Sequence, residues 1–167
     1  CNVPVNCVVA AEDVDFIYEL PARLHEQGID ARIFEMMNIW AKQPDLTPWQ
    51  EFVNRFQTAT TTVRIGIVGK YVDLVESYKS LNEALVHAGV ANNCKVELVH
   101  IDAEKLEKGA KVGLDDLDGV VVPGGFGVRG IEGKIRAVQL VREQSIPFLG
   151  ICLGMQLAVI EYARNVM

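Results

Sequence analysis

The chain has 167 residues, of which 50% are hydrophobic and 23% charged, and its formal net charge is −6 at pH 7. This composition is typical of a globular protein and argues against a disordered or collagen-like chain. The acidic balance argues against a general nucleic-acid binder, and every apolar run is far shorter than the ~20 residues of a membrane span. We therefore expect neither a nucleic acid nor a membrane as a partner.

The four cysteines, at positions 1, 7, 94 and 152, show neither the CxxC spacing of a metal site nor a dense disulfide framework. We therefore expect reduced thiols, a cytoplasmic location and no metal ligands in this chain. The sequence begins with a cysteine instead of a methionine and opens on an apolar run, so it reads as a fragment at both ends.

The first segment, residues 1–57, contains an apolar run at 3–10 that predicts a strand, and a helical pattern that ends at Gly28. Another helix is predicted to begin with Thr47 as its N-cap residue and Pro48 in its first turn. Residues 58–62 are mostly threonine and have no periodicity, which predicts a linker.

From residue 63 onward, short β-branched runs alternate with amphipathic helices. The pattern predicts strands at 63–69, 95–101, 117–125 and 146–151, and helices at 77–89 (ended by Gly89), at 131–144 and after 151. Such alternation is typical of an α/β fold, here a doubly wound, mostly parallel sheet with helices on both faces. Ligands bind beyond the carboxyl ends of such strands, where the glycine-rich turns 124–127 and 150–154 are expected.

Residues 150–154, Gly-Ile-Cys-Leu-Gly, have the spacing of a nucleophile elbow with cysteine in place of serine. The glycines leave room for close packing around a sharp strand-to-helix turn. The helix that follows Cys152 would favour the thiolate, the nucleophilic form, through its dipole and unpaired N–H groups. A structural cysteine at the end of an apolar strand fits the same five residues, so the motif alone leaves both interpretations open.

A second turn supports the enzymatic interpretation. The stretch "VVVPGGFG" ends another strand 28 residues before Cys152, since 152 − 124 = 28, and its Gly-Gly turn could offer a backbone N–H to the same site. Two such N–H groups, one from this turn and one from Leu153, are what an oxyanion hole requires. By itself, Pro-Gly-Gly is only a tight turn.

At these residues the sequence resembles a known family. "PGGFG" followed by "GICLGMQ" is similar to the class I glutamine amidotransferases. The flanking stretches "VGKYVDLVESYKSLNEALVHAG", "FGVRGIEGK" and, upstream, "CNVPV" with "EDVDFIYELP" resemble the CTP synthase family, and the resemblance covers nearly the whole chain.

The resemblance implies roles for residues at the two turns. Cys152 would attack the side-chain amide of glutamine, form a thioester and release ammonia. The backbone of Gly125 and Leu153 would form the oxyanion hole. The glutamine pocket would be lined by Gly125, Leu153, Gly154, Met155 and Gln156, and GTP would activate through the loop that holds Phe126 and Arg129.

The resemblance also implies a division of the chain. Residues 1–57 would end an ATP-dependent, P-loop-like α/β synthetase domain, in which Glu12, Asp13 and Val14 hold ATP, and residues 63–167 would begin the glutaminase domain. The parent, a homotetramer of pyrimidine biosynthesis, would use ATP with Mg²⁺, held by residues outside this chain, to convert UTP to CTP.

Acyl transfer by cysteine needs a general base, usually histidine. In the family this histidine follows the cysteine, whereas His25, His87 and His100 all precede Cys152. We therefore expect this polypeptide alone to be inactive. Two alternatives remain open: another cysteine-dependent class I amidotransferase or hydrolase, and a non-enzymatic α/β module with a structural Cys152.

Overall fold

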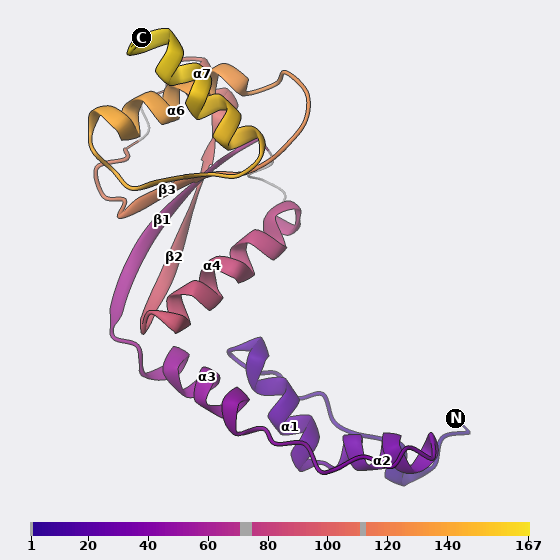
Figure 1. Ribbon diagram of the computed structural model, residues 1–167. Coiled ribbons are helices and arrows are strands. Elements are labelled where there is room, and N and C mark those ends of the chain that lie inside the picture. Colours follow the sequence, from indigo (N-terminus) through magenta and orange to yellow (C-terminus); the bar gives the residue numbers. More distant parts are fainter. Residues whose placement is uncertain (1, 71–74, 111–112) are drawn as a thin grey trace. The chain divides into compact units, whose positions relative to one another are not determined.

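The computed structural model describes residues 2–70, 75–110 and 113–167. The chain divides into two compact units, unit 1 (Cys1–Thr58) and unit 2 (Ala59–Met167), which are taken separately below (Figure 1). Helix α3 of unit 1 ends at Thr58 and strand β1 of unit 2 begins at Thr61. Of the expected linker 58–62, only residues 59 and 60 therefore lie outside regular elements.

Unit 1 is helical throughout its described residues. Its elements are the short 3₁₀ helices η1 (Val5–Cys7) and η2 (Ile17–Glu19) and the α-helices α1 (Leu20–Glu26), α2 (Ile29–Met36) and α3 (Thr47–Thr58). The prediction of a strand at 3–10 was wrong, because η1 occupies its centre. An apolar run becomes a strand only when another strand pairs with it, and the described part of unit 1 offers none. The α/β class expected for this segment stays a prediction.

The core of unit 1 is a small aromatic cluster. Phe16 is the only buried residue among residues 2–58, and its ring stacks on that of Phe56 with the centroids 3.6 Å apart. Trp49 of α3 donates from Nε1 to the carbonyl oxygen of Tyr18 at 2.7 Å. The aromatic residues that hold α3 to the η2 segment are Phe16, Tyr18, Trp49, Phe52 and Phe56.

Helix α3 begins at Thr47, with Pro48 in its first turn as predicted, but its capping residue is different. The backbone N–H of Thr47 donates to Oδ1 of Asp45 at 3.0 Å, and hydrogen bonds from Thr47 hold the pKa of Asp45 below its usual value. The prediction of Thr47 as N-cap was therefore wrong by position: the carboxylate two residues earlier satisfies the free N–H.

Unit 2 is built on a parallel sheet of four strands, as predicted. The strands are β1 (Thr61–Gly69), β2 (Cys94–Asp102), β3 (Gly119–Val122) and β4 (Phe148–Gly150), and their order in the sheet is β2-β1-β3-β4. Strand β3 pairs with β4 in the register Val122↔Gly150. The carboxyl ends of β3 and β4 therefore lie next to each other, and each continues into one of the two glycine-rich turns.

Helices lie on both faces of this sheet (Figure 1). Helix α4 (Lys79–Ala91), preceded by η3 (Val75–Tyr78), packs against β2 on one face, and α5 (Ala103–Glu107), α6 (Ile131–Glu143) and α7 (Leu153–Asn165) lie on the other. The main core lies between the strands and α5 and α6, and includes Val68, Val120, Val122, Ala137 and Val141. Within the described ranges, no helix is long and apolar enough to cross a membrane.

Gly89 does not end α4 as predicted. The helix continues to Ala91, and Gly89 is buried where α4 meets β2. A methyl group at Gly89 would lie 2.6 Å from Cγ2 of Val96 and 2.8 Å from the carbonyl oxygen of Cys94. The glycine therefore allows close packing of helix on strand, a role that the local pattern does not reveal.

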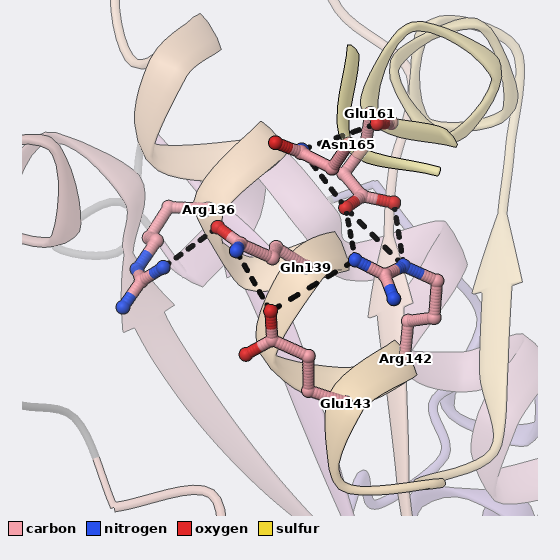
Figure 2. Close-up of polar contacts among 6 residues, drawn as sticks. All are labelled: Arg136, Gln139, Arg142, Glu143, Glu161 and Asn165. Carbon is pink, nitrogen blue, oxygen red and sulfur yellow. Dashed lines mark hydrogen bonds and ion pairs between the residues drawn. The ribbon is translucent and has the colours of Figure 1, made fainter. Parts of the chain in front are cut away.

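Helices α6 and α7 are joined by an ion pair whose acidic partner is buried and whose arginine is partly exposed, and Figure 2 shows it with its neighbours. Arg142 of α6 donates to both carboxylate oxygens of Glu161 of α7, at 2.8 to 3.2 Å, and Asn165 donates to Oε1 at 3.1 Å. The Glu161 side chain is 1% exposed. Hydrogen bonding from Arg142 lowers the pKa of Glu161 in spite of its burial. This pair fixes the far end of the helix that begins next to Cys152.

Candidate active site

Cys152 lies at the junction of β4 and α7, between Gly150 and Leu153, where a nucleophile elbow is expected. Its backbone angles, φ 51° and ψ −107°, lie in a region that residues with a Cβ rarely adopt. The two glycines of the motif are required by packing. A methyl group at Gly154 would lie 1.9 Å from the carbonyl oxygen of Val122, and one at Gly150 would lie 2.6 Å from the nitrogen of Met155.

The turn after β3 lies directly against Cys152. A methyl group at Gly124 would lie 3.4 Å from Cβ of Cys152, and the N–H of Ile151 donates to the carbonyl oxygen of Val122 at 3.0 Å. The structure thus brings together two turns that are 28 residues apart in the sequence. It does so because β3 and β4 are adjacent, parallel strands.

The backbone N–H groups of Gly125 and Leu153 are available to a ligand. Neither donates a hydrogen bond within the part of the chain that the structure describes. Leu153 is the first residue of α7, where an N–H has no acceptor inside its own helix. These are the two groups expected to form an oxyanion hole.

The Cys152 residue is exposed, which argues against a purely structural, buried thiol. Within the described residues its thiol makes no hydrogen bond, to a histidine or to any other group. His25 pairs with Asp30 in unit 1 at 2.7 Å, while His87 belongs to α4 and His100 to β2. Cys152 therefore lies where an elbow nucleophile is expected, but none of the described residues contacts its thiol as a general base.

The remaining residues expected to bind glutamine lie in the first turn of α7. Gly154 is buried against β3, whereas Met155 and Gln156 are exposed, Met155 by 54%. A ligand at Cys152 therefore meets backbone N–H groups together with side chains that face solvent.

The two residues expected in the activator loop have different surroundings. The ring of Phe126 is 89% exposed, and its carbonyl oxygen accepts a hydrogen bond from Nζ of Lys70. Arg129 is engaged by Glu104 of α5, with Nε 2.8 Å from Oε1. Of these two residues, Phe126 lines the pocket beside Gly125, and Arg129 does not.

The residues expected to hold ATP belong to unit 1. Glu12, Asp13 and Val14 lie in an irregular segment between η1 and η2, with Glu12 3.7 Å from Arg23 and Val14 half-buried. No group of three or more His, Cys, Asp or Glu side chains suited to a metal ion occurs among the described residues.

Sequence reasoning missed Lys134, which the structure places against the Gly124–Gly125 turn. A methyl group at Gly125 would lie 3.8 Å from Nζ of Lys134. The signal was present, because Lys134 shares the helical spacing of Ala137, Val138 and Val141, all of them buried on α6. A lysine in such an apolar stripe is an exception to the pattern.

Comparison with known proteins agrees with this geometry. Residues 73–167, more than half of the chain, match the family described as glutamine amidotransferase class-I. The chain belongs to the class I glutamine amidotransferase family. A solved structure of the Trypanosoma brucei CTPS glutaminase domain with bound acivicin is similar, with a TM-score of 0.53 and 38% identity over 62% of this chain and 41% of that one.

Curated relatives match almost the whole chain. The CTP synthases of Geotalea uraniireducens and Trichlorobacter lovleyi are each 55% identical to it over 168 aligned residues, which is 99% of this chain. The chain spans about a third of the length of these relatives. Membership of the amidotransferase family and the resemblance to CTP synthases are thus confirmed.

Proposed function

We propose that the chain is part of a CTP synthase, a glutamine-hydrolysing ligase, and that it carries the nucleophile of the glutaminase site. The observation that carries the proposal is the placement of Cys152 at a strained elbow, against Gly124 of the neighbouring strand end. The identity of 55% with CTP synthases along 99% of the chain supports the choice of this enzyme over other amidotransferases.

In the proposed reaction the Cys152 thiolate attacks the side-chain amide carbon of glutamine and forms a C–S bond. The amide oxygen becomes an oxyanion, which accepts hydrogen bonds from the N–H groups of Gly125 and Leu153. When the C–N bond breaks, the nitrogen takes up a proton and leaves as ammonia, and water then hydrolyses the thioester to glutamate. Met155 and Gln156 border the glutamine from the first turn of α7.

The proton in these steps needs a base, and the thiol contacts none among the described residues. In our proposal a histidine with an acidic partner, from the remainder of the parent enzyme, supplies it. We propose that the polypeptide by itself has no CTP synthase activity and negligible glutaminase activity. Glutamate release by this chain that is lost in Cys152→Ala would contradict that statement.

The ammonia would serve the synthetase reaction of the parent. ATP, bound with Mg²⁺ held by other residues of the parent, would phosphorylate the uracil O4 of UTP, and ammonia would displace the phosphate to give CTP. We assign ATP contacts to Glu12, Asp13 and Val14, and the action of GTP to the loop with Phe126 and Arg129. The parent would be a cytoplasmic homotetramer.

The decisive experiment is covalent labelling with a diazo ketone analogue of glutamine. The protein to be labelled is a chimera, in which the parts of the Geotalea uraniireducens relative that lie outside the aligned region are joined to this chain. We expect labelling of Cys152 only, detected by peptide mass spectrometry, with Cys7 and Cys94 as unlabelled internal controls. A chimera that supports CTP formation with Cys152 unlabelled would contradict the proposed nucleophile.

The same chimera separates CTP synthase from other amidotransferases. Asp13→Ala is expected to raise the KM for ATP in CTP formation while the labelling of Cys152 remains. Glu35→Ala, at an exposed position of α2 in the same unit, is the matched control. An unchanged KM for ATP in Asp13→Ala would refute the assigned ATP contact.

A further inference from the structure

Two charged residues are buried in the described part of the chain, and they differ in their surroundings. Glu161 has Arg142 and Asn165 as partners. Lys134 is 2% exposed, and it makes no hydrogen bond or ion pair with any described residue. A buried ammonium without a partner is unfavourable because it has lost its water. The contacts of the described residues therefore do not account for a charge at position 134.

The place of Lys134 in its helix adds to this cost. Lys134 lies in the first turn of α6, where the unpaired N–H groups and the helix dipole favour negative charge and disfavour a cation. Burial, and then the positive charge of Lys70, lower the pKa of Lys134. Lys70 has a partner of its own in the carbonyl oxygen of Phe126. A negative charge near Lys134 would offset all of these effects.

The turn after β3 connects Lys134 with the site of Cys152. A methyl group at Gly124 would lie 3.4 Å from Cβ of Cys152, and one at Gly125 would lie 3.8 Å from Nζ of Lys134. Within a residue, Cβ is about 2.5 Å from the backbone nitrogen, so Nζ lies within about 6 Å of the Gly125 nitrogen. The buried ammonium is therefore close to an N–H that is expected to bind the oxyanion.

We propose that Lys134 is a positioning residue of the oxyanion hole, whose ammonium acts through the Gly125 peptide to favour negative charge at that N–H. The inference rests on the proposed function, because the negative charge is the oxyanion formed when Cys152 attacks the amide of glutamine. Lys134 forms no bond and transfers no proton in this step.

The expected size of the effect follows from the distance. An oxygen that accepts a hydrogen bond from Gly125 lies about 3 Å beyond the nitrogen, and so within about 9 Å of Nζ of Lys134. With an effective dielectric constant of about 20, attraction between unit charges over this distance changes a rate by on the order of tenfold.

The first test measures glutamate release by the chimera with the Geotalea uraniireducens relative. Lys134→Met is expected to lower kcat for glutamine hydrolysis about tenfold and to leave the KM for glutamine nearly unchanged, because bound glutamine carries no oxyanion. Lys134→Arg keeps the charge and should retain most of kcat. Arg136→Met removes a positive charge from an exposed position of the same helix, and this matched control should keep the wild-type kcat.

The second test needs no catalysis and uses the whole 167-residue chain. Hydroxide removes the proton of an amide that has no hydrogen-bond acceptor, and a nearby positive charge speeds this step by stabilising the amide anion. The Gly125 N–H should therefore exchange with water severalfold more slowly in Lys134→Met than in the wild type, as measured by NMR. Exchange at Gly125 should be unchanged in Arg136→Met.

A second neutral variant keeps both tests decisive if Lys134→Met is poorly folded. Lys134→Gln also removes the charge but keeps a polar end, and it should show the same losses. Wild-type kcat in both neutral variants, or unchanged exchange at Gly125, would overturn the proposal. An equal loss of kcat in Lys134→Arg and Lys134→Met would also overturn it, because the effect would then follow side-chain shape instead of charge.

Failure of this inference and failure of the proposed function are distinguishable. Glutamate release that requires Cys152 but is the same with and without the charge at position 134 overturns the role of Lys134 alone. Release by the wild-type chimera that survives Cys152→Ala contradicts the proposed nucleophile, and the role of Lys134 fails with it.

Discussion

The backbone of Cys152 is held at φ 51° and ψ −107° by the packing of Gly150 and Gly154 on either side. For a residue with a Cβ such a conformation costs on the order of 1–3 kcal/mol. Glycine has no Cβ and adopts it with much less strain. Any residue with a Cβ at position 152 is therefore strained, whether or not it carries a thiol.

The strain at Cys152 predicts different stabilities for two substitutions that both remove the sulfur. Cys152→Gly should be more stable than Cys152→Ala by about 1 kcal/mol, after allowance for the greater freedom of glycine in the unfolded chain. Urea unfolding measures the difference. At Cys94, the first residue of an extended strand, the same pair should show alanine as the more stable. Equal stability of the two Cys152 variants would mean that the turn is unstrained.

Lys134 predicts an alkaline effect on stability. Its pKa in the folded chain is lowered from the ordinary value of 10.5, by burial and by Lys70. At a pH between the folded-state and the unfolded-state pKa of Lys134, the folded chain has lost a proton that the unfolded chain keeps. Unfolding therefore takes up a proton, and the free energy of unfolding rises with pH. The cost of the buried charge is present in full below the folded-state pKa and disappears as the pH approaches 10.5.

Urea unfolding at a series of pH values between neutral and alkaline checks this sign. The wild type should gain stability relative to Lys134→Met as the pH rises, and Lys134→Met should be at least as stable as the wild type at neutral pH. Lys95→Met serves as the control without a buried charge. Parallel pH profiles for the wild type and Lys134→Met would show that the ammonium is not destabilised by folding.

At the scale of elements, the contact between α6 and α7 depends on one buried charge. Arg142→Met would leave Glu161 buried with Asn165 alone, which predicts a loss of about 3 kcal/mol in the free energy of unfolding. The double variant Arg142→Met with Glu161→Leu should recover most of this loss, because no charge is then buried. Arg164→Met is the control: it breaks an exposed pair between the same helices and should cost less than about 0.5 kcal/mol.

The pair also predicts a response to acid. Since the pKa of Glu161 is lowered in the folded chain, its contribution is present above the unfolded-state pKa and is lost as the pH falls through the folded-state value. In Arg142→Met the lowering by Arg142 is lost while burial still raises the pKa of Glu161 and only Asn165 opposes it, so stability should begin to fall at a higher pH. Far-UV circular dichroism during acid titration measures this, and coincident acid transitions would contradict it.

Element positions in unit 2 followed from the sequence more faithfully than those in unit 1. In unit 2 each apolar run has a neighbouring strand, and the predicted strands 63–69 and 95–101 differ from β1 and β2 by at most two residues at an end. The run at 3–10 has a comparable local pattern but no described strand beside it. A strand depends on its partner, whereas the amphipathic helices α6 and α7 are specified mostly by their own spacing.

At the scale of the whole molecule, each unit has its own core. Among its described residues unit 1 has one buried residue, Phe16, packed with aromatic neighbours, while unit 2 buries a larger core between sheet and helices. Both tryptophans, Trp40 and Trp49, belong to unit 1. Tryptophan fluorescence therefore reports on unit 1 alone, and only Trp49 is packed, since Trp40 is 96% exposed.

We predict that urea unfolds the two units in separate transitions. The midpoint by tryptophan fluorescence should lie at lower urea than the main transition by far-UV circular dichroism, because a smaller core gives less stability. Arg142→Met should shift the second transition and leave the first in place. Superimposable curves from the two methods would show that the chain unfolds as one cooperative body.

The sequence by itself determined the positions of the two glycine-rich turns and the class of fold. Two glycine-rich turns at the ends of apolar runs identified Cys152 and Gly125, and the alternation of strands and helices predicted the parallel sheet. These features are local, because the backbone preferences of glycine and the spacing of apolar side chains act within a few residues. Family membership followed from the same short motifs.

Only the tertiary structure decided which of these features meet. The order β2-β1-β3-β4 places Gly124 beside Cys152, and the packing of α6 on the sheet buries Lys134 against Gly125. The local sequence pattern predicts neither contact, because each contact joins segments that are far apart in the chain. Burial of long-range neighbours, and not backbone preference, therefore set the surroundings of Cys152.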